Sequence, residues 1–324
     1  MSVPTITVAP DDVEWARLVD RLTRRGFLGG IGALGATALL TACGTSGAGT
    51  ESSAAQSSRT VTTPLGTYDI PTSPQRVVVI DSRLDLEPAL ALELPVIAHS
   101  YDAPAPWLPE ITAEEIASPV NLEQVLRLQP DLIVCVNLDN EMWPAPALLD
   151  IAPVVTTEFR MPWKQNMNQL ADWLGRTETF DRAMATYDDA AAGLVDRHGE
   201  TIRQARIGII SRQPAEFRMV HDTTAYLPPQ VYTDLGGTLG TIGTLGNADA
   251  FGMESLDLLA DLDGLLVLST GAELGSLTTD PLWQRVPAVA RGRVQVVEQL
   301  IQYGSVYSAI ELVAQYDTLL SRLG

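Results

Sequence analysis

The chain has 324 residues, of which 40 are acidic and 21 are basic, and its formal net charge at pH 7 is −19. Proteins that bind nucleic acid need a basic surface to neutralise phosphates, so the charge excludes that class and we expect no nucleic-acid partner. Two cysteines and three histidines, with no second histidine at ligand spacing, argue against a metal site built from those side chains. We therefore expect no intrinsic cofactor and no metal bound by the protein itself.

The first 43 residues carry two export signals. Arg24 and Arg25 precede an apolar run over residues 27–42, and the run ends in Leu-Thr-Ala followed by Cys43. About 16 residues reach only ~24 Å as a helix, short of the ~30 Å hydrocarbon core, so the run is typical of a removable signal rather than a membrane span. We interpret residues 1–42 as a twin-arginine lipoprotein signal peptide and Cys43 as the lipidated residue. The alternative is a buried apolar helix with an incidental cysteine.

Residues 43–60 follow, rich in Gly, Ser, Thr and Ala with almost no apolar bulk. Such a segment cannot bury a core and reads as a flexible tether. The remaining residues are enough for two lobes, which we place at 61–176 and 205–324.

Short β-branched runs alternate with amphipathic stretches through both lobes, a pattern typical of parallel sheets covered by helices. We predict strands at residues 76–80, 95–98, 131–136, 154–157, 207–211, 217–221, 265–269 and 294–298. We predict helices at residues 122–128, after the cap Asn121, and at residues 305–323.

Residues 177–204 contain no proline, and their apolar positions are spaced by three and four residues. This spacing predicts one long amphipathic helix between the lobes. The expected fold is therefore α/β, with two Rossmann-like lobes, each a mostly parallel sheet with flanking helices, joined by one long α-helix. Such a helix would permit only small movements of one lobe against the other.

Three ordered stretches resemble a known family. They are PVNLEQVLRLQPDLIVCVN (residues 119–137), IAPVV (151–155) and DPLWQRVPAVARGRVQVVE (280–298). These stretches look like those of the iron-siderophore and cobalamin class of ABC-transporter substrate-binding proteins, the class III type whose lobes are linked by a single helix. The similarity extends over nearly all of the chain after the tether.

The resemblance implies a lipid-anchored monomer on the extracytoplasmic face of the cell membrane, which captures a ferric siderophore and delivers it to an ABC permease. Members of the family present one glutamate on each lobe to arginine pockets of the permease. Glu123 matches the first of these, and Glu254 is the match for the second. The alternative is that a glutamate near a helix start only complements the helix dipole.

Ligand residues are expected in loops that leave the carboxyl ends of the strands. Aromatic faces and guanidinium groups suit a bulky chelate with partly anionic oxygens. The candidates are Arg83, Tyr101, Trp107, Trp143, Arg160, Arg212, Arg218, Tyr226 and Tyr303. Some hydroxamate-binding relatives have an aromatic pair before the Tyr-Gly that Tyr303 matches, and this chain has Ile301 and Gln302 there.

Several alternatives stay open. A cobalamin or haem receptor would share the fold, and Tyr226 or Tyr303 could supply an axial ligand to haem. An exported hydrolase is disfavoured because the chain lacks the GxSxG and HExxH motifs, and we expect no enzyme activity and no catalytic residue. The third alternative is a sensor that has lost transport.

Overall fold

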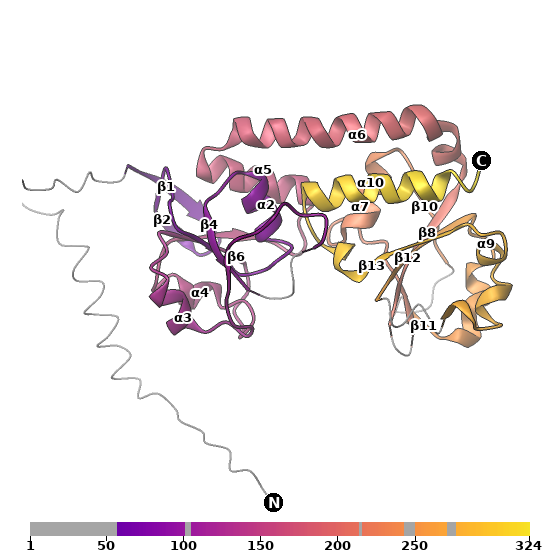
Figure 1. Ribbon diagram of the computed structural model, residues 1–324, viewed down its shortest axis with the longest axis horizontal. Helices are drawn as coiled ribbons and strands as arrows, with labels where there is room; N and C mark the ends of the chain where they lie inside the picture. The colour runs from indigo at the N-terminus through magenta and orange to yellow at the C-terminus, as the bar shows by residue number, and fades with distance from the viewer. Residues whose placement is uncertain (1–56, 101–104, 214–215, 243–249, 271–276) are drawn as a thin grey trace, which may run out of the picture. The chain divides into compact units, whose positions relative to one another are not determined.

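The computed structural model describes residues 57–100, 105–213, 216–242, 250–270 and 277–324. The predicted signal peptide, Cys43 and most of the tether lie outside these residues. Two β-sheets with helices on their faces are joined by one long helix, α6 (Thr177–Gln204), which confirms the predicted α/β fold (Figure 1). Among the described residues, no helix has both the length and the apolar character needed to cross a membrane.

The N-terminal lobe contains a five-stranded sheet with the order β5-β4-β3-β6-β7, and every neighbouring pair is parallel. An antiparallel hairpin of β1 and β2 precedes it. The strands are β1 (Ser58–Thr63), β2 (Gly66–Pro71), β3 (Val77–Val79), β4 (Val96–His99), β5 (Glu114–Glu115), β6 (Leu132–Val136) and β7 (Val154–Thr157). The helices are α2 (Leu86–Ala91), α3 (Leu122–Arg127), α4 (Ala145–Leu148) and α5 (Trp163–Leu174).

The C-terminal lobe contains a six-stranded sheet with the order β11-β9-β8-β12-β13, and β10 also pairs with β8. Strands β8, β10, β12 and β13 are parallel, whereas β9 is antiparallel to both of its neighbours, β8 and β11. The strands are β8 (Arg206–Arg212), β9 (Phe217–Met219), β10 (Thr238–Leu239), β11 (Ala250–Phe251), β12 (Gly264–Ser269) and β13 (Val294–Glu298). The helical segments are α7 (Leu227–Asp234), η1 (Met253–Leu259), η2 (Trp283–Arg285), α9 (Pro287–Ala290), η3 (Gln299–Gln302) and α10 (Val306–Leu320).

All eight predicted strands are present, with ends that shift by at most two residues. Asn121 caps α3 as expected, since its Oδ1 accepts from the backbone N of Gln124 at 3.1 Å. The sequence prediction missed β1, β2, β5, β10 and β11. Strand β1 begins at Ser58, inside the predicted tether, because the polar Thr-rich hairpin pairs by its backbone without an apolar alternation that would reveal it.

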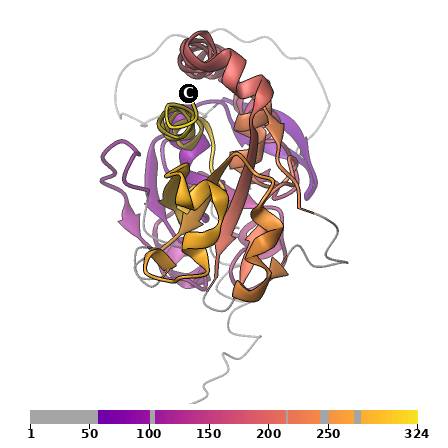
Figure 2. The ribbon, with the colours of Figure 1, turned by 90° about the vertical axis from the view of Figure 1, so that its right-hand side faces the viewer.

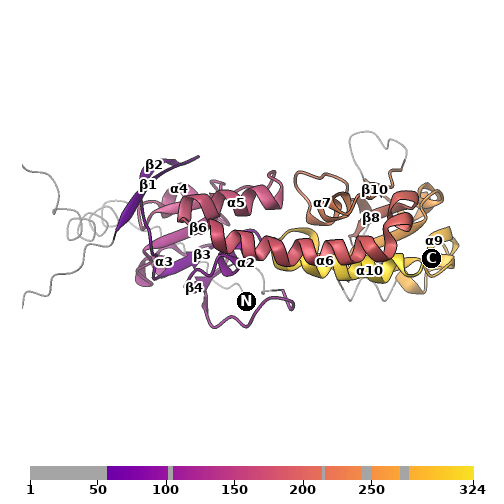
Figure 3. The same cartoon turned by 90° about the horizontal axis from the view of Figure 1, so that it is seen from above.

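Helix α6 has 28 residues, which corresponds to about 42 Å of length. It runs over both lobes and lies beside α10 (Figures 1 and 3), and both helices cover the same side of the C-terminal sheet (Figure 2). Asp317 on α10 accepts from Arg197 Nε at 3.2 Å, and its Oδ1 lies 2.8 Å from His198 Nε2. A second helix thus supports the C-terminal part of the connecting helix.

The largest apolar core crosses from one lobe to the other. It joins Val134 of β6, Met167 of α5, Tyr187 of α6, Ile209 of β8 and Leu312 of α10, all of them buried. Two smaller cores fill the opposite faces of the two sheets, one beneath α3 and α4 and one beneath η1, η2 and α9. A wide separation of the lobes would expose the shared core to water, so burial of apolar surface opposes it.

A buried carboxylate of the N-terminal lobe caps the helix that closes the C-terminal lobe. Glu87, on α2, accepts from the backbone N of Ser305 at 2.7 Å and from the backbone N of Ser308 at 3.2 Å, and the Ser308 hydroxyl donates to its other oxygen. These N–H groups belong to the first turn of α10, where a negative charge is favourable. Gly304 makes room, because a Cβ there would lie 2.9 Å from Glu87 Oε1.

Burial raises the pKa of Glu87 to about 7. The hydrogen bonds from Ser305 and Ser308 lower this pKa in part, and the charge of Asp81 raises it further. The ordinary value is 4.5, so between the two values the folded chain binds more protons at this site than the unfolded chain does. The stability contributed by Glu87 is therefore fully present below about pH 4.5 and falls as the pH rises towards 7.

We expect Glu87→Gln, which cannot ionise, to gain stability relative to the wild type as the pH rises from 5 to 7.5. The relative gain should be on the order of 2 to 3 kcal/mol. Urea unfolding of both proteins at the two pH values measures it. Asp85 is a second buried acid whose pKa is raised, and it is present in both proteins. Its contribution therefore largely cancels when the unfolding free energy of the variant is compared with that of the wild type. The exposed Glu141→Gln is the control and should show no such pH-dependent gain; a constant difference for Glu87→Gln would contradict the assignment.

Candidate functional site

Polar and aromatic residues follow the parallel strands at their carboxyl ends in both lobes. Asp81 follows β3 and Phe159 follows β7 in the N-terminal lobe, and Arg212 and Glu298 end β8 and β13 in the C-terminal lobe. In open α/β sheets this edge is where ligands bind. The candidate site is therefore sought where the two edges meet.

Four aromatic rings from both lobes meet there, and we call them the aromatic cluster: Trp143, Phe159, Tyr226 and Tyr303. The Phe159 ring lies edge-on to Trp143 at 5.3 Å and to Tyr303 at 5.4 Å between centroids. The Tyr226 ring is 5.7 Å from that of Tyr303. All four side chains are half-buried, so the cluster presents part of its aromatic surface to solvent.

A fixed arginine lies over this cluster. The Arg83 guanidinium carbon is 5.2 Å from the centre of the Tyr303 ring, a cation–π distance. Asp81 holds the arginine and one ring in place: Arg83 Nη2 lies 3.9 Å from its carboxylate, and Trp143 Nε1 donates to it at 3.3 Å. Asp81 is fully buried, and its other oxygen accepts from the backbone N of Arg83 at 2.8 Å.

Asp85 holds the backbone of Asp81 in place by a hydrogen bond. Its carboxylate accepts from the backbone N of Asp81 at 2.9 Å, from the backbone N of Val136 at 3.2 Å and from the Thr157 hydroxyl at 2.6 Å. These groups lie at the ends of β3, β6 and β7, so one side chain joins three strand ends. Burial, and then the charge of Asp81, raise the pKa of Asp85 to about 8.

Two further predicted site residues lie near the cluster without joining it. Arg160 is 82% exposed, and its Nη1 lies 3.7 Å from the carboxylate of Asp222, so it forms a surface ion pair between the lobes. Trp107 turns towards the start of α10, where its Nε1 donates to the Ser308 hydroxyl at 2.8 Å.

The other predicted residues lie elsewhere or outside the described residues. Arg212 packs over the Phe217 ring at 4.8 Å and donates to the backbone oxygen of Glu216 at 3.2 Å. Arg218 pairs with the Glu216 carboxylate at 2.9 Å on the surface. Tyr101 lies outside the described residues.

The prediction from sequence missed Phe159, Asp81 and Asp85. The signal was available for Asp81, which follows the end of β3, where the carboxyl-end rule places a site, whereas Asp85 lies further along the chain, directly before α2. Phe159 follows β7 in the same way. Nothing in the sequence revealed that it would bridge Trp143 and Tyr303.

The arrangement suits the binding of an organic molecule. It offers aromatic faces and a guanidinium group next to one another, a combination that stacks on apolar or conjugated surface and donates to anionic oxygen. In the described part of the chain, no group of three or more His, Cys, Asp or Glu could hold a metal ion.

The two glutamates expected to dock to a permease are both exposed in the first turn of a helical segment, Glu123 in α3 and Glu254 in η1. Helix α3 and strand β11, which leads into η1, lie on the side of the two lobes opposite α6 (Figure 1). Glu254 also lines a groove of about 380 Å³ together with Leu282, which is 43% exposed, and Arg285.

No family model matches the chain. Two proteins of Bacillus subtilis (strain 168) are related to it in sequence. The "Iron-uptake system-binding protein" is 23% identical over 270 residues, which cover 76% of this chain and 82% of the relative. The "Iron(3+)-hydroxamate-binding protein YxeB" is 26% identical over 211 residues, which cover 61% of this chain and 63% of the relative. Both relatives are binding proteins, which confirms the expectation that the chain is not an enzyme.

Solved structures share the fold. A periplasmic solute-binding protein of Mycobacterium smegmatis matches with a TM-score of 0.68 at 19% identity over 82% of this chain and 99% of that one. The iron-uptake ABC transporter substrate-binding protein PiaA of Streptococcus pneumoniae matches with a TM-score of 0.63, also at 19% identity and over 82% of this chain and 99% of its own. SirA of Staphylococcus aureus, in complex with staphyloferrin B, matches with a TM-score of 0.62 at 19% identity over 82% of this chain and 98% of its own. The chain is thus a distant relative of the iron-siderophore ABC-transporter substrate-binding proteins and has their class III periplasmic binding protein fold, as its sequence indicated.

Proposed function

We propose that this protein is an extracytoplasmic solute-binding protein that captures a ferric siderophore and delivers it to an ABC permease. The observation that carries the proposal is the aromatic cluster with Arg83, which draws side chains from both lobes to one point between them. Distant relatives named for iron uptake and for ferric hydroxamate binding support it, as does the neighbouring structure with staphyloferrin B.

The chemistry of a ferric chelate fits this point. The chelator surrounds the iron with oxygens that keep partial negative charge and with an apolar or aromatic shell. Arg83 would donate to the oxygens, while the rings of Trp143, Phe159 and Tyr303 would pack on the shell. In this proposal the chelator supplies all the ligands of the iron, and the protein supplies none.

Delivery requires a surface that a permease can recognise. Glu123 and Glu254 lie one on each lobe, both exposed and both at the start of a helical segment, so they form a pair of negative contacts for basic pockets on a partner. The carboxylate of Glu254 lies against Gly252, where a Cβ would be 2.4 Å from Oε2. A side chain at position 252 would therefore displace the exposed Glu254 carboxylate.

The proposed localisation is the outer face of the cell membrane, where a diacylglyceryl group on Cys43 would anchor the chain. The support is the sequence of residues 24–43, with its paired arginines, apolar run and terminal cysteine. An anchor of this kind would keep the receptor close to a permease in the same membrane.

We expect ferric siderophores to quench tryptophan fluorescence, since Trp143 lies in the cluster. Titration with ferric hydroxamates, catecholates and citrate measures the dissociation constant. Tyr303→Ala should weaken binding by about tenfold or more because it removes the ring that contacts Phe159, Tyr226 and Arg83. Tyr303→Phe keeps the ring and should stay within about threefold.

Absence of binding by all three chelate classes would contradict the proposal. Parallel titrations with cobalamin and haemin test the alternative receptors of the same fold.

The double variant Glu123→Arg with Glu254→Arg should abolish uptake of the radiolabelled chelate in cells and leave its dissociation constant unchanged. The reason is that both side chains are exposed and lie away from the aromatic cluster. Glu178→Arg, at an exposed first-turn position of α6 on the opposite side, is the matched control and should transport normally. Normal uptake by the double variant would rule out docking through these residues.

Cys43→Ser should move the protein from the membrane fraction to the soluble extracytoplasmic fraction, since it removes the thiol that takes the lipid. Immunoblots of fractionated cells show the change. Arg24→Lys with Arg25→Lys tests the export route separately and should leave unprocessed protein in the cytoplasm. Retention of the serine variant on membranes would argue against a lipid on this residue.

A further inference from the structure

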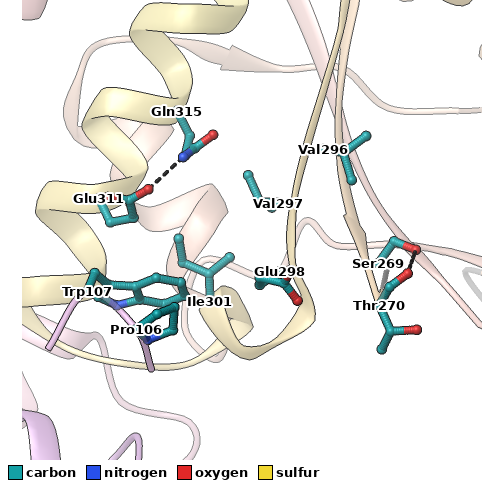
Figure 4. Close-up of a pocket in the computed structure, with 10 residues that line it drawn as sticks. All are labelled: Pro106, Trp107, Ser269, Thr270, Val296, Val297, Glu298, Ile301, Glu311 and Gln315. Carbon is teal, nitrogen blue, oxygen red and sulfur yellow. Dashed lines mark hydrogen bonds between the residues drawn. The ribbon is translucent and has the colours of Figure 1, made fainter. Parts of the chain in front are cut away.

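A second cavity lies beside the aromatic cluster and is not used by the site described above. It has a volume of about 380 Å³ and lies between α10, β13 and the segment that carries Trp107 (Figure 4). Ser269 and Glu298, at the carboxyl ends of β12 and β13, form part of its wall. Ile301 lines it too, only two residues before Tyr303 of the cluster, so the cavity is adjacent to the candidate site.

One part of the cavity wall is apolar and fixed. The indole of Trp107 is held by its Nε1–H bond to Ser308, so its remaining contribution to the cavity is the ring itself. Ile301 is buried next to it, and Val297 and Pro106 extend the apolar surface. Such a wall accepts an apolar body, and an indole also attracts a cation to its face.

The polar part of the wall is made of acceptors. Glu298 and Glu311 both line the cavity, and none of the described residues that line it is Arg, Lys or His. The carboxylate of Glu298 accepts no hydrogen bond from a described residue and forms no ion pair with one. An anionic ligand would meet two carboxylates in a chain of net charge −19, so the cavity disfavours it.

A chain of hydrogen bonds sets the orientation of Glu311. Gln295 Nε2 donates to Gln315 Oε1 at 2.6 Å. Gln315 Nε2 in turn donates to Glu311 Oε1 at 2.6 Å, the bond drawn in Figure 4. The first bond fixes which end of the Gln315 amide faces Glu311. The second occupies one carboxylate oxygen of Glu311 and leaves Oε2 without a partner among the described residues.

We propose that this cavity binds a positively charged organic group, a primary ammonium or a guanidinium, whose apolar part packs on Trp107 and Ile301. The charge would lie between Glu298 and Glu311, with the indole adding a cation–π contact. The group has two possible sources, a separate small amine or a cationic arm of the chelate held by the aromatic cluster. The second source rests on the proposed function, whereas the first does not.

The first experiment tests the site without any siderophore. Phenethylammonium is titrated into the ¹⁵N-labelled full-length protein, and the indole N–H resonance of Trp107, identified by its loss in Trp107→Phe, is followed by NMR. We expect a shift of this resonance and binding at least about fivefold tighter than that of the neutral phenethyl alcohol. Equal affinity for the ammonium and the alcohol would overturn the proposal.

Glu311→Gln and Glu298→Gln should each weaken the ammonium about threefold or more and leave the alcohol unaffected, since only the charge is removed. Glu141→Gln removes one negative charge in the other lobe and is the control for net charge. Unchanged ammonium affinity in both cavity variants would show that the cavity holds solvent only.

The second experiment distinguishes the sources of the cation. A linear ferric trihydroxamate with a terminal primary amine is compared with its N-acetyl derivative. Tighter binding of the amine, lost in Glu311→Gln, assigns the cavity to an arm of the chelate, and equal binding assigns it to a separate amine. Failure of both chelates to bind would count against the proposed function for this ligand class. Whether the cavity binds a cation would still be decided by the phenethylammonium titration.

Discussion

One buried contact ties the N-terminal lobe to the last helix of the C-terminal lobe: the Glu87 side chain accepts hydrogen bonds from the first turn of α10. Glu87 belongs to the N-terminal lobe and α10 follows the last strand of the C-terminal lobe, so this contact joins the two lobes at their centre. Taking a carboxylate out of water is costly, which is why its pKa rises, and the N–H groups of a helix start offset part of that cost. Ser308 extends the contact to Trp107, so the helix start, the N-terminal lobe and the wall of the side cavity share one set of hydrogen bonds.

The same arrangement, a buried acid that accepts from backbone N–H groups, recurs at the end of β3. Asp85 joins three strand ends, and Asp81 above it holds Arg83 and Trp143. Each acid is satisfied by several donors, which is the condition under which a buried carboxylate is tolerated. Arg83 and Trp143 are therefore held in position by Asp81, and Asp81 by Asp85, and both of these acids are buried.

Most of the fold was predictable from the sequence, since long β-branched runs and the periodicity of residues 177–204 are local signals. The polar hairpin of β1 and β2 and the two-residue strands β5, β10 and β11 could not be predicted. They are recognised by their pairing with a neighbouring strand and not by their composition. The site was predictable in part. The strand-end rule led to Arg83, Trp143, Tyr226 and Tyr303, which lie together, but it equally led to Arg212 and Arg218, which bond to Glu216 instead. Which of several loop residues converge depends on loop conformation, and that depends on buried partners from other loops, as Asp81 is for Trp143.

The contacts between the lobes are unequal, and this limits how the protein can respond to a ligand. On the helix side, α6, α10 and a shared apolar core join the lobes, and the backbone N of Trp163 on α5 donates to Gln230 on α7 at 2.8 Å. On the strand-end side, Arg160 and Asp222 form an exposed pair, of a kind worth about 0 to 1 kcal/mol. Movement of the lobes would therefore be small and would open the strand-end side while the helix side stays closed. Under the proposed function there is little room for closure, so discrimination between ligands would come from side chains already in place: the rings and Arg83 of the aromatic cluster and the carboxylates of the cavity.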